Sequence, residues 1–196
     1  MIKRAFDILF SIIGLVILSP AFLLVAVFIK IDSNGPVFYK QSRVGKNNKD
    51  FILYKFRTMN VGSDKEGLLT VGNNDSRITK TGYLLRKYKL DELPQLMNVL
   101  KGDMSFVGPR PEVRKYVSLY NEEQKKVLTS RPGITDVASI EYRNENELLE
   151  KTSNPEEFYV KEVMPDKLKM NIMYINDRSF FKDIKIIFKT IKSILS

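Results

Sequence analysis

The chain has 196 residues and a net charge of +9, and it contains neither cysteine nor histidine. This length suits one domain, or one domain with an appendage. The missing residue types exclude a disulfide framework, a thiolate nucleophile, an imidazole general base and thiolate or imidazole metal sites. Catalysis would therefore use carboxylates, Lys, Arg, Tyr or hydroxyls, and a metal would need oxygen ligands, which suits Mg²⁺. The positive charge indicates an anionic partner: nucleic acid, an anionic membrane surface or a phosphorylated substrate.

The first predicted element is an apolar helix. Residues 8–29 carry no charge, and at about 1.5 Å per residue they are long enough to cross a bilayer core of roughly 30 Å. Pro20 removes the helical hydrogen bond to Val16 and kinks the chain, and the Ser19 hydroxyl is placed to bond a carbonyl freed at the bend. Basic residues flank both ends, so charge does not assign the ends to opposite sides of a membrane. A kinked spanning helix and a re-entrant helix that leaves by its entry face both fit.

A β-hairpin is predicted next, from short strands at 37–41 and 51–56 joined by a Gly/Asn-rich turn. Alternation along the second strand places Lys55 and Arg57 on the same face. Two cations on one side of a strand end suit a phosphate, and a solvated strand edge is the alternative interpretation.

Asp91 and Glu92 form an acid pair between a basic amphipathic helix and an apolar helical segment at 93–100. Pro94 belongs in the first turn of a helix because it cannot donate a backbone hydrogen bond. This predicts Asp91 at or near the N-cap and Glu92 just inside, where the helix dipole favours negative charge. A capping Asp beside a solvated Glu is the alternative to a catalytic pair.

Arg110 is flanked on both sides by proline, which fixes the backbone around it. A guanidinium held in this way suits bidentate recognition of phosphate, and a structural pair with a carboxylate is the alternative. With Lys55, Arg57 and Arg86, this cation would neutralise a diphosphate leaving group. One carboxylate of the acid pair could attack phosphorus and form an acyl-phosphate, while the other held Mg²⁺ or accepted a proton.

The C-terminal part contains a predicted short strand at 137–140 and a final amphipathic helix at 179–195. A basic amphipathic helix is typical of a segment that lies on a membrane surface, and a helix packed on the core with lysines in water is the alternative. Its apolar stripe comprises Phe180, Phe181, Ile184, Ile187, Phe188, Ile191 and Leu195.

Several ordered motifs carry a family resemblance. They are residues 3–7, 19–20, 35–38, 41–45, 54–59, 90–96, 98–105, 107–111 and 131–135. Together they resemble the bacterial sugar transferase family, the monotopic phosphoglycosyl transferases that act on polyprenol phosphates. The resemblance is close over residues 2–135 and looser over the C-terminal segment.

The resemblance implies transfer of a sugar 1-phosphate from a nucleotide diphosphate sugar, usually a UDP-sugar, to undecaprenyl phosphate with release of UMP. The product would initiate a surface polysaccharide or glycoprotein glycan. The resemblance also implies that Asp91 is the nucleophile and that Glu92 acts at a bound Mg²⁺ or in proton transfer. By the same resemblance, Arg110 binds phosphate with support from Lys55 and Arg86.

The resemblance further maps Ser19 and Pro20 to the helix break of the family, which favours the re-entrant interpretation. The expected fold is α+β and mostly α-helical, with a small β-hairpin. Residues 1–32 are expected to form a re-entrant helix-break-helix in the inner membrane. Residues 33–196 are expected to form a catalytic domain on the cytoplasmic face, with interfacial amphipathic helices.

This chain departs from the family pattern at two places. Many members read Gly-Ile-Thr-Gly-Trp-Ala-Gln where this chain has Asp136, Val137 and Ser139 at the fourth, fifth and seventh positions. Many also carry an acidic residue where this chain has Asn171, ahead of Tyr174. Both departures would shape the donor pocket, so the sequence leaves the sugar open.

Two other functions compete with catalysis. A membrane-anchored protein that binds nucleic acid or anionic lipid would also use a charge of +9. However, the cations are spread over separate motifs and no nucleic-acid motif is present, so no nucleic-acid partner is expected. A scaffold subunit with a non-catalytic acid pair is the second alternative. The oligomeric state stays open, with a homo-oligomer among the choices.

Overall fold

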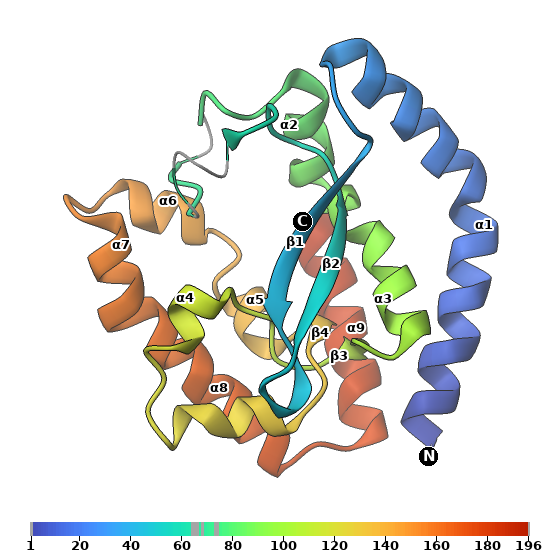
Figure 1. The fold of residues 1–196 in the computed structure, drawn as a ribbon. Helices are drawn as coiled ribbons and strands as arrows, with labels where there is room; N and C mark the ends of the chain where they lie inside the picture. The colour runs from blue at the N-terminus through green and yellow to red at the C-terminus, as the bar shows by residue number, and fades with distance from the viewer. Residues whose placement is uncertain (1, 64–66, 68, 73–74, 196) are drawn as a thin grey trace.

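The computed structural model describes residues 2–63, 67, 69–72 and 75–195, and its described part is mostly helical with two small two-stranded sheets (Figure 1). This confirms the predicted α+β class. The strands are β1 (Phe38–Val44), β2 (Asp50–Phe56), β3 (Ser105–Val107) and β4 (Gly133–Thr135). The helices are α1 (Ile2–Asp32), α2 (Lys80–Lys87), α3 (Leu96–Lys101), α4 (Arg114–Val117), α5 (Val137–Glu141), α6 (Glu145–Glu150), α7 (Pro155–Phe158), α8 (Met164–Asn176) and α9 (Phe180–Leu195). Short 3₁₀ segments occur at Lys46–Asn48, Leu90–Gln95 and Gln124–Thr129, and a π-helical turn at Tyr159–Val163.

Helix α1 is continuous over 31 residues with Pro20 inside it, whereas the sequence predicted two halves separated by a break. The Ser19 hydroxyl satisfies the carbonyl that Pro20 leaves without a helical donor. It donates to the Val16 carbonyl at 2.8 Å, the group that Pro20 cannot reach, as the sequence predicted. The helix curves along one side of the molecule (Figure 1).

The two faces of α1 differ in their surroundings. The inner face packs on the domain: Ile29 is buried against Phe56 and Leu85, and at Gly14 a Cβ would lie 3.1 Å from Leu96. The outer face is apolar and open to solvent, and a contiguous exposed apolar patch is typical of a surface that contacts a membrane or another protein. Its residues that are at least half exposed between positions 9 and 31 are Leu9, Val16, Ile17, Leu23, Leu24, Val27, Phe28 and Ile31. Within the described ranges, α1 is the one helix long and apolar enough to cross a membrane.

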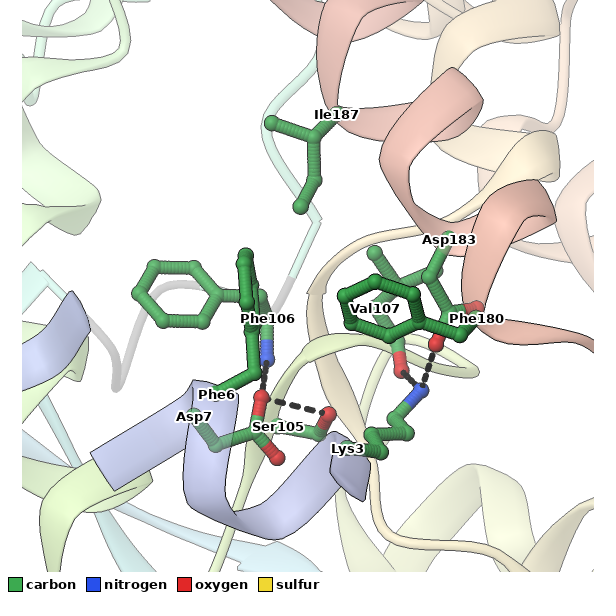
Figure 2. Close-up of a pocket in the computed structure, with 9 residues that line it drawn as sticks. All are labelled: Lys3, Phe6, Asp7, Ser105, Phe106, Val107, Phe180, Asp183 and Ile187. Atoms are coloured by element: carbon green, nitrogen blue, oxygen red, sulfur yellow. Dashed lines mark hydrogen bonds and ion pairs between the residues drawn. The ribbon is translucent and has the colours of Figure 1, made fainter. Parts of the chain in front are cut away.

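The N-terminal turns of α1 are fastened to β3 (Figure 2). The buried Asp7 carboxylate accepts from the Ser105 hydroxyl at 3.1 Å. The Lys3 ammonium donates to the Val107 carbonyl at 2.7 Å and pairs with Asp183 of α9 at 2.6 Å. These polar residues therefore dock α1 on the domain rather than facing solvent.

The C-terminal end of α1 is fastened by Arg57. Its buried guanidinium donates to the carbonyls of Ser33, at 2.7 Å, and Asn34. These carbonyls follow the last turn of a helix and so lack helical partners. Nearby, the Asp32 carboxylate accepts from the Thr81 amide at 2.8 Å. The sequence predicted Arg57 as a phosphate-binding cation, but the structure commits its guanidinium to the end of α1.

The predicted hairpin is confirmed, because β1 and β2 pair antiparallel from Phe38 opposite Phe56 to Val44 opposite Asp50. The second sheet was not predicted: β3 and β4 pair in parallel, with Ser105 opposite Gly133. The strand predicted at 137–140 is wrong. This segment is α5, because the Asp136 side chain accepts from the Ser139 amide and caps a helix.

The C-terminal helices close the core. The largest apolar cluster joins β1 with α4, α6 and α8. Helix α9 is confirmed as amphipathic, but its predicted apolar stripe is divided between two faces. Ile187 of the stripe packs against Val107 together with Ile186, which the prediction left out, while Phe181 and Phe188 point outward, 83% and 67% exposed.

Candidate active site

The acid pair lies in the first turn of the 3₁₀ segment Leu90–Gln95, which leads into α3. Asp91 and Glu92 are both buried, at 6% and 8% exposure. The predicted acidic first turn is confirmed, but Asp91 is not the N-cap. Lys89 takes that place with a left-handed backbone (φ 55°), so the turn begins earlier than the position of Pro94 suggested.

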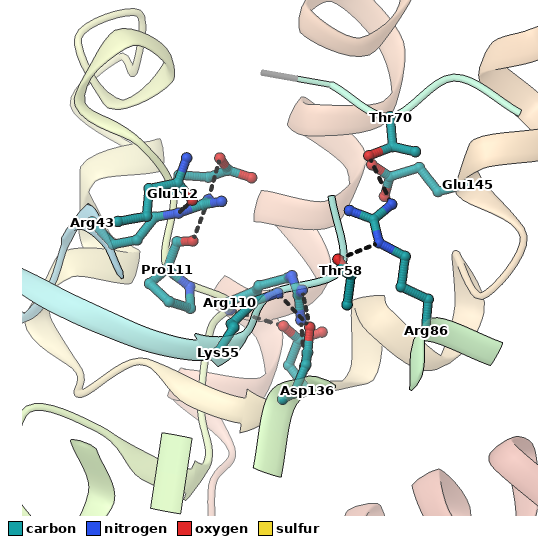
Figure 3. A network of polar contacts seen from close by, with 12 residues as sticks. Arg43, Lys55, Thr58, Thr70, Arg86, Arg110, Pro111, Glu112, Asp136 and Glu145 are labelled. Carbon is teal, nitrogen blue, oxygen red and sulfur yellow. Dashed lines mark hydrogen bonds and ion pairs between the residues drawn. The ribbon is translucent and has the colours of Figure 1, made fainter. Parts of the chain in front are cut away.

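Glu92 is held by two cations from separate elements. Arg110, in the loop after β3, donates to both carboxylate oxygens, at 2.5 and 3.3 Å. Lys55 of β2 donates to the nearer oxygen at 2.8 Å (Figure 3). Burial opposes ionisation of Glu92, but Arg110 and Lys55 outweigh it and hold the pKa of Glu92 well below its usual value. Glu92 is therefore an ionised counter-charge that fixes Lys55 and Arg110.

Asp91 has a different environment from its neighbour. No hydrogen bond to its carboxylate is found within the described part of the chain. Burial raises the pKa of Asp91, although the charge of Lys55 opposes this rise. A partly desolvated carboxylate that is not held by hydrogen bonds is available for bond formation, whereas that of Glu92 is occupied.

Arg86 of α2 lies beside the pair, where the charge of Asp91 partly offsets the lowering of its pKa by burial. Its guanidinium donates to the hydroxyls of Thr58 at 2.9 Å and Thr70 at 3.1 Å (Figure 3). Gly82 permits this placement, because a Cβ there would lie 2.0 Å from the Thr58 carbonyl. The structure thus gathers Lys55, Arg86 and Arg110 around the acid pair, without Arg57.

The carboxylates available as ligands limit how a Mg²⁺ ion would bind. Among the described residues no group of three or more carboxylates could hold a metal. Mg²⁺ often takes one or two carboxylates and completes its shell with water and substrate phosphates. The open Asp91 carboxylate fits that mode, whereas both Glu92 oxygens face cations. The residues therefore fit a metal held by Asp91 and substrate phosphates better than one held by both acids.

Asp136 was expected to shape the donor pocket, but its contact with Arg110 was not predicted. Its carboxylate is 1% exposed and accepts from the Arg110 backbone amide at 2.8 Å. The available signal was an Asp followed by a short apolar run, which is typical of a helix N-cap. That signal was missed because residues 137–140 were interpreted as a strand.

Comparison with known proteins gives consistent matches over the whole chain. The model of the family described as bacterial sugar transferase matches residues 1–196. The UDP-N-acetylgalactosamine-undecaprenyl-phosphate N-acetylgalactosaminephosphotransferase of Aeromonas hydrophila is 39% identical, over 100% of this chain and 44% of that protein. The uncharacterized sugar transferase EpsL of Bacillus subtilis is 40% identical, over 99% of this chain and 87% of that protein.

The UDP-glucose:undecaprenyl-phosphate glucose-1-phosphate transferase of Escherichia coli is 36% identical, over 97% of this chain and 39% of that protein. The chain thus spans less than half the length of the Aeromonas and Escherichia relatives and most of the Bacillus relative. Two of these three relatives are named as transferases of sugar phosphates to undecaprenyl phosphate. The chain belongs to the bacterial sugar transferase family.

Proposed function

We propose that this chain transfers a sugar 1-phosphate from a UDP-sugar to undecaprenyl phosphate and releases UMP. The names of the Aeromonas and Escherichia relatives support this donor and acceptor class. The observation that carries the proposal is the contrast within the acid pair. The Asp91 carboxylate is buried and accepts no hydrogen bond from the described residues, whereas the Glu92 carboxylate holds two cations.

The reaction would proceed in two displacements at one phosphorus atom. An Asp91 carboxylate oxygen attacks the sugar-bearing phosphorus, and the bond to the bridging oxygen breaks, so that UMP leaves with that oxygen. A phosphate oxygen of undecaprenyl phosphate then attacks the same phosphorus. The acyl-phosphate bond breaks, which restores the Asp91 carboxylate and leaves a sugar diphosphate on the lipid.

The cations of the site would stabilise charge on the transferred phosphate and on UMP. Arg110 is suited to a bidentate contact and its side chain is 32% exposed, while Lys55 lies beside it on the same carboxylate. Arg86 would add a third charge on the side of Asp91. Glu92 keeps this cation group assembled before the donor binds. A Mg²⁺ ion, when held by Asp91 and the donor phosphates, would neutralise further charge.

The apolar surfaces support a membrane location for this chemistry. We propose that the outer face of α1 enters the inner membrane from its cytoplasmic side, and that Phe181 and Phe188 of α9 rest on the interface. Both ends of α1 are bonded to one domain, through Asp7 and Arg57. A helix with both ends on one domain favours a re-entrant course over a spanning one.

The test incubates the 196-residue chain in nanodiscs with Mg²⁺, undecaprenyl phosphate and a panel of UDP-sugars, and UMP release is the readout. One or more donors should release UMP, and mass spectrometry should find a phosphosugar on the peptide that contains Asp91. Asp91→Asn should abolish both signals, whereas Glu123→Gln, which removes an exposed carboxylate paired with Lys126, should leave them unchanged. Activity of Asp91→Asn close to that of the wild type would overturn the assignment.

A further inference from the structure

The loop that carries Arg110 has few ways to be held. In the segment 108–111 both prolines lack an amide hydrogen, so only Gly108 and Arg110 donate from the backbone. Gly108 donates to the Thr135 carbonyl at 3.1 Å, an extension of the β3–β4 ladder. Arg110 donates to a carboxylate oxygen of Asp136 at 2.8 Å. Asp136 therefore accepts the one backbone hydrogen bond that Arg110 donates.

Asp136 is itself fixed from the opposite side. Its second carboxylate oxygen accepts from the Ser139 amide at 2.5 Å and caps α5. The carboxylate thus joins the start of α5 to the backbone of Arg110, and it is only 1% exposed. Figure 3 shows Asp136 next to Arg110. Bonds to buried, charged acceptors are among the stronger hydrogen bonds in proteins.

The base of the loop has no room to shift. A Cβ at Gly108 would lie 2.3 Å from the Arg131 carbonyl, and one at Gly133 would lie 2.2 Å from the Gly108 nitrogen. Beyond Arg110, the Pro111 carbonyl accepts from the Arg43 guanidinium at 3.0 Å. The main chain is therefore hydrogen-bonded at Gly108, at Arg110 and at Pro111, and Asp136 is the acceptor at Arg110.

We infer that Asp136 is a positioning residue, which holds the backbone of Arg110 so that the guanidinium meets the donor diphosphate in one geometry. This inference rests on the proposed role of Arg110 in phosphate binding. The guanidinium is paired with Glu92 and must adjust when a phosphate arrives. A fixed backbone limits that adjustment to the side chain, and misplacement by about 1 Å costs about a hundredfold in rate.

The first test measures the tether without any substrate. Asp136→Ser keeps a good N-cap for α5, but its short side chain offers one oxygen, so the Arg110 amide loses its acceptor. Hydrogen exchange at Arg110, followed by NMR of full-length protein in nanodiscs, should become at least about tenfold faster. Exchange at Ser139 should not change. The matched control is Ser139→Ala, which keeps that backbone amide and should leave exchange at Arg110 unchanged. Unchanged exchange at Arg110 would overturn the inference.

The second test is a double-mutant cycle on UMP release, with the donor that the wild type uses best. Asp136→Ser should lower kcat by about 10- to 100-fold with little change in KM. In an Arg110→Ala background it should cause no further loss, because Asp136 acts through Arg110. Multiplied losses in the double mutant would contradict the positioning role. Asn154→Ala, which removes the cap of α7, should lower stability and leave kcat unchanged.

A second substitution covers the case in which Asp136→Ser does not fold. Asp136→Asn keeps the side-chain length but has one acceptor oxygen, which serves either Arg110 or Ser139. A fall in kcat must then accompany faster exchange at Arg110, and faster exchange at Ser139 alone must leave kcat unchanged. The opposite association would overturn the inference. Exchange at Arg110 reports on the tether even if no UDP-sugar is turned over, so the two proposals fail separately.

Discussion

Asp91 and Glu92 are adjacent acidic residues with unlike environments, because their contacts differ. Glu92 is surrounded by Arg110 and Lys55, which keep it ionised, while Asp91 has no hydrogen bond to its carboxylate within the described residues. The sequence could show that two acids begin a helical turn, since Pro94 marks the place. It could not show which acid the cations reach, because Lys55 and Arg110 come from distant segments.

The Glu92 contacts predict a pH dependence of stability. Its pKa lies well below the usual value of 4.5, so its ionised form stabilises the folded state above pH 4.5, and this stabilisation is lost as the pH falls further. Glu92→Gln lacks this contribution and should lower the unfolding free energy at pH 7 by about 1–3 kcal/mol. Urea unfolding in detergent should find that this difference shrinks below pH 4.5, and an equal difference at all pH values would contradict the ion-pair account. Glu123→Gln is the surface control.

Arg57 gives a second prediction for a single residue. Its guanidinium bonds carbonyls at the end of α1, so Arg57→Met should lower the unfolding free energy by about 1–3 kcal/mol through the lost bonds. The turnover of each folded molecule should stay close to that of the wild type, as judged by UMP release normalised to folded protein. A stable variant with greatly reduced turnover would instead support the predicted role of Arg57 in phosphate binding.

The secondary-structure elements follow local sequence signals to different degrees. The β1–β2 hairpin was predictable from alternation and a Gly/Asn turn, and α9 from its amphipathic period. The three-residue strands β3 and β4 were not, because short parallel strands pair residues that are far apart in sequence. The role of Arg57 was missed for a related reason. Strand β2 ends at Phe56, so its alternation does not place the Arg57 side chain. The carbonyls to which Arg57 donates lie just after α1, far away in the sequence.

Helix α1 yields a prediction at the level of the element. Pro20→Ala restores an amide donor to Val16 and removes the ring, so the helix should straighten and favour a spanning course. The chain has no cysteine, so single cysteines at Ile2 and Ser33 give unique labels. With Pro20 retained, both single-cysteine variants should react with an impermeant maleimide from the cytoplasmic side alone. With Pro20→Ala one end should become reactive from the opposite side, and labelling identical to that of the Pro20 variants would contradict the prediction.

At the scale of the whole molecule, α1 is part of the domain and not an appended anchor. Its inner face covers Phe56 and Leu85, and its ends bond Ser105 and Arg57. A chain without residues 2–32 would expose this apolar surface and leave the buried Ser105 hydroxyl without its acceptor, Asp7. We expect that chain to lack a cooperative thermal transition by circular dichroism, even in detergent where the full-length protein has one. A sharp transition in the shortened chain would contradict this.

The two faces of α1 link the folding of the domain to its insertion into the membrane. One surface of the helix completes the interior, and the other, if it enters lipid as we propose, is stable only in a bilayer. Folding and insertion would then be a single coupled equilibrium, in which the composition of the surrounding lipid sets how much of the enzyme is assembled. Lipids that accommodate a curved 31-residue helix would increase the active fraction without a change in the proposed catalytic side chains.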